Sequence, residues 1–491
     1  YLRESEFFLA LIEDDEEVTI PEHCYKDDTT IASEADFKHL LNVIRVWGVK
    51  PIIEDVITYT LSGNVNDWQS IIAEYGRELS YLEDLHKISS DPDQQHCAVA
   101  TGHLEIVTHI YRHKHSWDDH CSIIAAQKGF LPILVFAHEN ELDLSQFVCE
   151  ETAANGHLDC LKYLHTVADK ALHEECCEVA AAGGHLSCLR YLVENDCPCD
   201  EGTTASAAEG GHLECLMYLH EAGCPWDYTT PHEAAREGHL SCIIYAHENG
   251  CEWFDTAPAM AAMGGQLECL KYLHENGCTW NSSTPCSAAH SGHLDCLRYA
   301  TQYGCPKRGD TCGGAFFSAH FDCLVFAHEH DYPWPLDLFG DEKQYDLPPA
   351  TDESYLECLI YAHSHGWPWY ISTLNTFARM GHTKCLEFAH THGAQWDSEL
   401  CASAAAGRHV STLMFLVKHG CSLDNRTILA AFESASLECL QFAHEHGCPW
   451  PAGFTRILRG RNRYNYEEEL RRCVLYAHEH GCPFDATVLL R

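Results

Sequence analysis

Residues 230–243, TPHEAAREGHLSCI, decide the fold, because the chain repeats this stretch along most of its length. Residues 203–216, TTASAAEGGHLECL, and residues 284–297, TPCSAAHSGHLDCL, are two further copies. The glycine of the motif, or the residue in its place, falls mostly 27 residues apart, at positions 102, 129, 156, 184, 211, 238, 265, 292, 319, 354, 381, 408 and 435. A fixed period of this length is typical of a solenoid, in which each unit buries its apolar face against its neighbours.

One repeat, residues 203–229, shows what each unit should form. Small residues predict a short helix over 203–209, and a second helix begins at His212. Cys215, Leu216 and Leu219 have the spacing of one buried stripe on that second helix. Gly223 is expected to end it, because glycine readily adopts the left-handed conformation found after helices. The unit is therefore helix–turn–helix–loop, and the fold class is all-α.

The motif resembles the ankyrin repeat signature through Thr230-Pro231, Ala234-Ala235 and Gly238-His239-Leu240. The resemblance covers about residues 95–485 and implies an ankyrin-like helical solenoid, a curved stack of about fourteen helix-turn-helix repeats. Thr230 would cap its helix. An ankyrin unit usually has about 33 residues, so the β-hairpin fingers between units should be shortened or absent here. Short repeats of this kind are common in protists and large DNA viruses.

The chain should consist of an N-terminal segment, residues 1–62, and an array, residues 63–491. The array carries insertions near residues 335–350 and 452–470, where the period lengthens. Residues 1–62 are out of register with the repeat. They form either the polar helical cap that a solenoid end needs or a degenerate box-type module that docks a ubiquitin-ligase core. Since the sequence begins at Tyr1 rather than methionine, organelle targeting by an upstream segment stays open.

The formal net charge of −42 restricts the class of partner. So acidic a surface repels nucleic-acid phosphates and anionic lipid and favours basic proteins. The alternative is that the charge only keeps a long array in solution. Nucleic acid binding is not expected except through the arginine cluster from Arg456 to Arg472. No run of about 18 apolar residues exists, which argues against membrane insertion.

Most of the 29 cysteines occupy two fixed positions of the repeat. We interpret them as reduced packing residues, which predicts a cytoplasmic or nuclear location. A zinc site is not expected, because Cys215 and His220 point about 140° apart on a helix of 3.6 residues per turn. No metal and no cofactor are therefore predicted.

Two further columns recur in the repeat. Tryptophan occupies one loop position, where it should bury in the groove between consecutive units or, alternatively, form a binding ladder. The tryptophans are Trp226, Trp253, Trp280, Trp334, Trp369, Trp396 and Trp450. Histidine near the end of the second helix should bond to the loop of a neighbouring unit. These histidines are His165, His220, His247, His274, His328, His363, His390, His444 and His478.

No catalytic constellation is present, because the polar residues recur with the repeat whereas an active site is a single convergent place. The chain is expected to be a non-enzymatic protein–protein interaction scaffold, or a structural or adaptor subunit of a larger complex. The alternative is a substrate-recruiting adaptor of a ubiquitin ligase. Its oligomeric state is unknown.

Candidate partner-binding residues lie where units differ from one another. Exposed first-helix positions supply the first set, which comprises Glu209, Glu233, Arg236, Met263, His290 and Arg379. Phe339 and Tyr345 of the first insertion suit a protein contact, or else fold back on the array. The second insertion is basic, with Arg456, Arg459, Arg461 and Arg463. These arginines suit an acidic partner, phosphate or RNA, or else neutralise the chain's own acidic surface.

Overall fold

The computed structural model describes residues 94–114, 117–308, 310–334, 351–451 and 467–482, together with Leu41 and Ile88. Within these residues there are 26 helices and no strand, so the all-α prediction is confirmed. The chain divides into two compact units, Tyr1–Trp226 and Asp227–Arg491, which we call the first unit and the second unit; each contains several of the repeats. Almost all of the expected N-terminal segment, residues 1–62, lies outside the described residues. The insertion at 335–350 and most of the insertion at 452–470 lie outside them too.

The first unit contains five described helix pairs. Its first helices are α6 (Gln94–Thr101), α8 (Asp119–Lys128), α10 (Val148–Ala154), α12 (Glu174–Ala182) and α14 (Glu201–Glu209). Its second helices are α7 (Leu104–Lys114), α9 (Leu131–Glu139), α11 (Leu158–Thr166), α13 (Leu186–Glu194) and α15 (Leu213–Glu221).

The second unit continues the same alternation. Its first helices are α16 (Thr229–Glu237), α18 (Ala257–Met263), α20 (Ser283–His290), α22 (Asp310–Phe317), α25 (Ile371–Met380), α27 (Ser398–Ala406) and α29 (Asn425–Glu433). Its second helices are α17 (Leu240–Glu248), α19 (Leu267–Glu275), α21 (Leu294–Gln302), α23 (Phe321–Glu329), α26 (Thr383–Thr391), α28 (Val410–Lys418) and α30 (Leu437–Glu445). Two longer helices, α24 (Asp352–Ser364) and α32 (Glu467–Glu479), also belong to the second-helix row.

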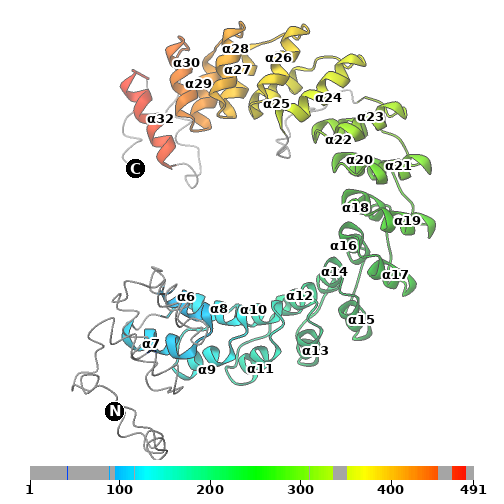
Figure 1. Cartoon of the computed structure of the whole chain (residues 1–491), viewed down its shortest axis with the longest axis vertical. Helices are drawn as coiled ribbons and strands as arrows, with labels where there is room; N and C mark the ends of the chain where they lie inside the picture. The colour runs from blue at the N-terminus through cyan, green and yellow to red at the C-terminus, as the bar shows by residue number, and fades with distance from the viewer. Residues whose placement is uncertain are drawn as a thin grey trace, which may run out of the picture. The chain divides into compact units, whose positions relative to one another are not determined.

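Within each unit the helices form two layers (Figure 1). First helices pack on first helices, as α16 does on α18 and α18 on α20, and second helices pack on second helices. Each first helix also packs on the second helix of its own pair. A stack of this kind has no central core, so its apolar contacts are all between neighbouring helices.

The repeat motif explains both layers. On α15, Cys215, Leu216 and Leu219 are buried, which confirms the predicted stripe. On α16, Ala234 and Ala235 are fully buried, because alanine lets adjacent first helices approach closely. Helix α16 begins at Thr229, whose backbone N–H donates to an oxygen of Asp227 at 2.8 Å. The prediction that Thr230 caps this helix is therefore wrong, because the preceding aspartate supplies the acceptor and Thr230 is buried inside the helix.

The Gly-His pair of the motif joins one unit to the next. Gly265 has φ of +72°, and a Cβ on it would lie 2.5 Å from Nδ1 of His293 in the following unit. The histidine ring thus takes the space that a side chain would occupy. In the first unit, Nε2 of His185 hydrogen bonds to the carbonyl of Ala154, at the end of the preceding first helix, at 3.0 Å. The motif therefore encodes a contact between units as well as a turn.

Large aromatic residues replace the small ones between α22 and α25, on either side of residues 335–350. Phe316 and Phe377 stand at positions where other first helices carry buried alanine, and both are buried. Their ring centroids are 6.4 Å apart, and Tyr355 of α24 contacts Phe377 at 5.8 Å. The rings occupy the space between these helices, whereas most other first helices pack closely through alanine.

The cysteines are mostly free and buried, as the sequence predicted. Burial raises the pKa of Cys215 to about 11, so this thiol stays protonated and packs as a small apolar group. The prediction that all are reduced is wrong for one pair, since Cys199 and Cys224 form a disulfide. Cys199 stands 27 residues before Trp226, in the place of a loop tryptophan. A covalent link between consecutive loops thus replaces an aromatic contact.

Candidate functional site

A ladder of rings runs along the C-terminal ends of the second helices. The ring of His247 stacks on Trp253 of its own unit, with centroids 3.9 Å apart. Its Nδ1 atom shares a hydrogen bond of 3.1 Å with the hydroxyl of Tyr272 in the next unit. His274, Trp280 and Tyr299 repeat this arrangement, with a hydrogen bond of 3.0 Å.

The ladder corrects the prediction for the histidines and confirms part of that for the loop tryptophans, which are half-buried rather than buried. The histidine partner is a tyrosine of the neighbouring second helix rather than a loop, because the helices stack closely enough for the two side chains to meet. The tryptophans do bridge consecutive units. Nε1 of Trp369 donates to the carbonyl of His392 at 3.2 Å, and Nε1 of Trp450 donates to the carbonyl of His480 at the same distance.

A row of exposed glutamates follows the histidines in the second unit. We call it the carboxylate row; it comprises Glu248, Glu275, Glu329, Glu445 and Glu479. Each is the last residue of its second helix. A carboxylate there faces the negative end of the helix dipole, which is unfavourable by about 0.3–1 kcal/mol at an exposed site. Within the described residues no ion pair joins any member of the row to lysine or arginine, although Lys271, one helical turn before Glu275, interacts with it electrostatically.

The row lies beside the ladder. Burial and then the carboxylate of Glu248 raise the pKa of Tyr272, and burial and then Glu445 raise the pKa of Tyr476. Each of these glutamates is thus close to a tyrosine of the next repeat. The row is interrupted at α21, α24, α26 and α28, which end in Gln302, Ser364, Thr391 and Lys418. An edge of this kind attracts cationic groups.

Exposed aromatic side chains also occur in the loops that follow the second helices. Tyr228 and Phe254, from two consecutive loops, are 42% and 48% exposed, and their ring centroids are 5.2 Å apart. Tyr303, directly after α21, is 51% exposed. Aromatic faces beside carboxylates can bind the cation and the aliphatic stem of lysine or arginine. We call the carboxylate row together with these three aromatic residues the loop edge.

Comparison with protein families accounts for the repeat. The family model of ankyrin repeats, in three copies, matches residues 231–310. This span holds the helix pairs α16–α17, α18–α19 and α20–α21. Residues 231–310 therefore match ankyrin repeats. Ankyrin repeats imply a role in protein–protein interaction.

Two kinds of solved structure are similar to the chain. The human ASB11 ankyrin repeat domain is 24% identical, with a TM-score of 0.29, over 32% of this chain and 84% of that one. The pentatricopeptide repeat protein PPR10, solved in complex with an 18-nucleotide psaJ RNA element, is 11% identical, with a TM-score of 0.31, over 92% of this chain and 75% of that one. No curated protein matches the chain. No described helix is long and apolar enough to cross a membrane.

The contact residues predicted from the sequence lie at the C-terminal ends of first helices, and not on the loop edge. Arg236, Met263, His290 and Arg379 stand at or next to the C-terminal ends of α16, α18, α20 and α25. Met263, His290 and Arg379 are exposed, whereas Arg236 is half-buried and pairs with Glu233 at 2.8 Å.

The other predicted residues divide between the first unit and the undescribed stretches. Glu209 ends α14 and is exposed. Phe339, Tyr345, Arg456, Arg459, Arg461 and Arg463 lie outside the described residues. Sequence reasoning missed the loop edge, although the recurring His-Glu pair was visible, as at residues 247–248 and 274–275.

One group of potential metal ligands comes together in the described residues, formed by His96, Asp118 and Cys121. Nε2 of His96 lies 2.9 Å from both oxygens of Asp118. Asp118 also caps α8 by accepting the N–H of Cys121 at 3.1 Å. Burial raises the pKa of Cys121 to about 12, which opposes the thiolate that zinc requires. These contacts are those of a helix cap, and we assign no metal to them.

Proposed function

We propose that this chain is a non-enzymatic interaction scaffold whose ankyrin repeats bind a protein with a basic surface or segment. The observation that carries this proposal is the carboxylate row, which places an exposed glutamate at the unfavourable end of five of the nine described second helices of the second unit, with no ion pair to lysine or arginine in the described part of the chain. Folding alone does not favour glutamate at these positions. A cationic partner would make the electrostatic free energy of each glutamate favourable in the complex.

The other features of the loop edge support the same kind of partner. Tyr228 and Phe254 add exposed apolar area on two consecutive loops, and Tyr303 lies against His274 of the ladder. Aromatic residues are enriched where binding energy concentrates. The net charge of −42 would speed encounter with a cationic protein and slow it with a nucleic acid. The ends of the first helices, with Met263 and Arg379, are a second contact surface in this proposal.

The test is an affinity purification from the native lysate with the intact chain and two matched variants. The row variant is Glu275→Gln/Glu329→Gln/Glu445→Gln. The control variant, Asp295→Asn/Asp322→Asn/Glu438→Gln, removes three exposed carboxylates in the first turns of second helices, where the helix dipole favours them. Both variants lose the same net charge, so general electrostatic attraction is matched.

We expect a set of basic proteins to be retained by the intact chain and by the control variant and lost from the row variant. Equal loss from both variants would show that only net charge matters. Retention by both would remove the loop edge from the proposal and leave the first-helix ends as the binding surface.

The finer role of the scaffold depends on residues 1–62. If this segment is a box-type docking module, the chain is a substrate-recruiting adaptor of a ubiquitin ligase. Deleting residues 1–62 would then remove the ligase components from the purified set and keep the basic proteins. If the segment is only a cap, deletion leaves both sets unchanged. We place the protein in the cytoplasm or nucleus, a proposal supported by the many free thiols of the described residues.

A further inference from the structure

Two repeat positions that are 20 residues apart can each carry cysteine. The first lies in the first helix and the second in the loop after the second helix. Most units place cysteine at one of them only, as in the pairs Pro231/Cys251, Pro258/Cys278, Pro285/Cys305 and Ile428/Cys448. Cysteine occupies both positions in Cys177/Cys197 and Cys401/Cys421. The pairing of two thiols is therefore particular to certain units and is not a consequence of the repeat.

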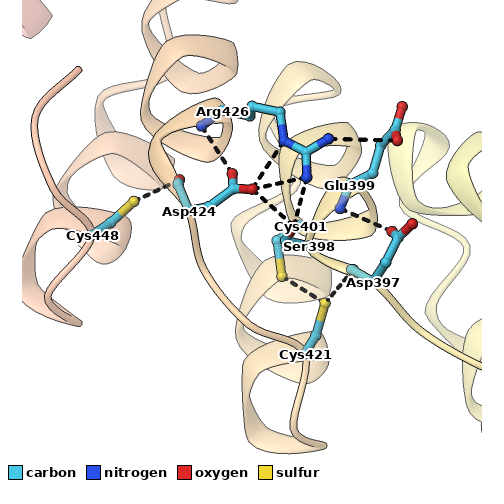
Figure 2. Close-up of polar contacts among 8 residues, drawn as sticks. All are labelled: Asp397, Ser398, Glu399, Cys401, Cys421, Asp424, Arg426 and Cys448. Atoms are coloured by element: carbon cyan, nitrogen blue, oxygen red, sulfur yellow. Dashed lines mark hydrogen bonds and ion pairs between the residues drawn. The ribbon is translucent and has the colours of Figure 1, made fainter. Parts of the chain in front are cut away.

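In the second unit the thiols of Cys401 and Cys421 are in direct contact. Sγ of Cys401, in α27, lies 3.0 Å from Sγ of Cys421, in the loop after α28 (Figure 2). Sγ of Cys421 also donates to the carbonyl of Asp397 at 2.9 Å. Cys401 is fully buried and Cys421 is 6% exposed. Since a disulfide has an S–S length of about 2.05 Å, closing it requires the sulfurs to approach by about 1 Å.

Polar contacts on both sides hold the sulfurs in place (Figure 2). Asp397 caps α27 by accepting the N–H of Glu399 at 2.9 Å. Asp424, three residues after Cys421, accepts from Ser398 of α27 at 2.8 Å and from Arg426 at 2.9 Å. The loop is thus fixed against the same helix that carries Cys401. This reduces the movement that would separate the thiols.

We propose that Cys401 and Cys421 are an oxidisable dithiol site that closes to a disulfide by exchange with glutathione disulfide. The thiolate of Cys421, the more exposed of the two, attacks one sulfur of glutathione disulfide and releases one glutathione thiolate. The thiol of Cys401 then loses its proton and attacks Sγ of Cys421, which releases the second glutathione thiolate. Two protein thiols and one glutathione disulfide become one protein disulfide and two glutathione thiols, so atoms and electrons balance.

The electrostatics of the pair suit this order of attack. The hydrogen bond from Cys401 lowers the pKa of Cys421 and raises that of Cys401. The chain already holds one disulfide, Cys199–Cys224, in its other unit. The new bond would join α27 to the loop after α28 and would constrain the unfolded chain there.

The test is a redox titration of the full-length folded protein in glutathione buffers, followed by alkylation of the remaining thiols and tryptic mapping. Trypsin leaves Cys421 on residues 419–426 and Cys401 on residues 385–408, which also contain Cys385. We expect a linked pair of these peptides, about 2 Da lighter than their sum. Tandem fragmentation should place the bond at Cys401.

Cys448 provides the matched control, because its thiol donates to the carbonyl of Asp424 at 2.7 Å as that of Cys421 does to Asp397. The variant Cys448→Ser should form the linked peptides, and Cys401→Ser should not. The wild-type map decides the question even if a variant fails to fold. The proposal is overturned if both thiols of the folded chain remain separately alkylated under oxidising buffer, or if Cys421 is recovered only as a glutathione adduct.

Discussion

At the scale of single residues, the turn glycine and the histidine of the following unit form one contact. Gly265 has His293 against the place of its missing Cβ, and Gly292 has His320 in the same position. Ala319 and Arg408 hold the glycine position with φ of +57° and +66°. In the repeats that follow them, the position of the histidine is held by Tyr355 and Ser436. At these two turns a residue with a side chain is followed by a repeat without the histidine, because a Cβ and the histidine ring would occupy the same space.

The variant Gly265→Ala is expected to destabilise the protein more than Gly277→Ala. Both glycines have positive φ, which costs an alanine about 1–2 kcal/mol. A Cβ on Gly277 meets nothing within 4 Å, whereas one on Gly265 meets the ring of His293. The urea midpoint should therefore fall further for Gly265→Ala. Adding His293→Ala should remove the difference between the two glycine variants, and an undiminished difference would contradict the contact.

Stability should fall as the pH is lowered from 7.5 to 5.5. Burial lowers the pKa of several histidines in the second unit, namely His232, His320, His328, His382 and His409. In the unfolded chain they titrate near the usual value of about 6.5. Protons therefore bind the unfolded state first, and the contribution of the neutral rings is present above pH 6.5 and lost below it. Melting temperatures across this range check the prediction, and an unchanged value would show that these rings do not control stability.

At the scale of elements, a histidine–tyrosine hydrogen bond joins several pairs of adjacent second helices, among them α17–α19, α19–α21, α23–α24 and α30–α32. Between α24 and α26, phenylalanine stands in the place of the tyrosine. His363 faces the ring of Phe388 at 5.9 Å, and its Nδ1 atom is buried with no hydrogen-bond partner. A buried polar atom without a partner costs about 1–3 kcal/mol. This step of the ladder therefore lacks a contact that the preceding step, between α23 and α24, has.

The variant Phe388→Tyr is expected to stabilise the protein by about 0.5–1.5 kcal/mol, because the new hydroxyl can bond to His363. The reverse change, Tyr272→Phe, should destabilise it by a similar amount, since it removes the partner of His247. Urea denaturation of the two single variants measures both effects. A loss of stability in Phe388→Tyr would mean that the hydroxyl does not fit between these helices.

The sequence predicts the elements better than the contacts between them. The 27-residue period, the buried stripe of Cys215, Leu216 and Leu219 and the left-handed turn at Gly223 are local patterns, and the structure confirms them. The tyrosine partner of the histidines and the Cys199–Cys224 disulfide depend on how neighbouring units align. That alignment is set by packing over many residues, which spacing along one chain does not specify.

At the scale of the whole molecule, one chain repeats a single type of helix pair many times. In the second unit the carboxylate row places glutamates on two pairs of successive second helices, α17–α19 and α30–α32, and on α23, so a partner with several cations could engage more than one at once. Once the first contact forms, each further contact with the same partner is intramolecular, so several weak contacts together give tighter binding. Electrostatic contacts of this type weaken with salt, because exposed charges are screened over about 10 Å at 0.1 M.

The most direct test of the proposed function is hydrogen exchange of the intact chain with and without its captured partner, read by mass spectrometry. Binding along the loop edge predicts slower exchange at the C-terminal ends of second helices, in residues 272–278, 326–332 and 442–448. The helix starts that carry Asp295, Asp322 and Glu438 should exchange unchanged. Protection confined to the first-helix ends, or to residues 1–62, would contradict binding through the carboxylate row.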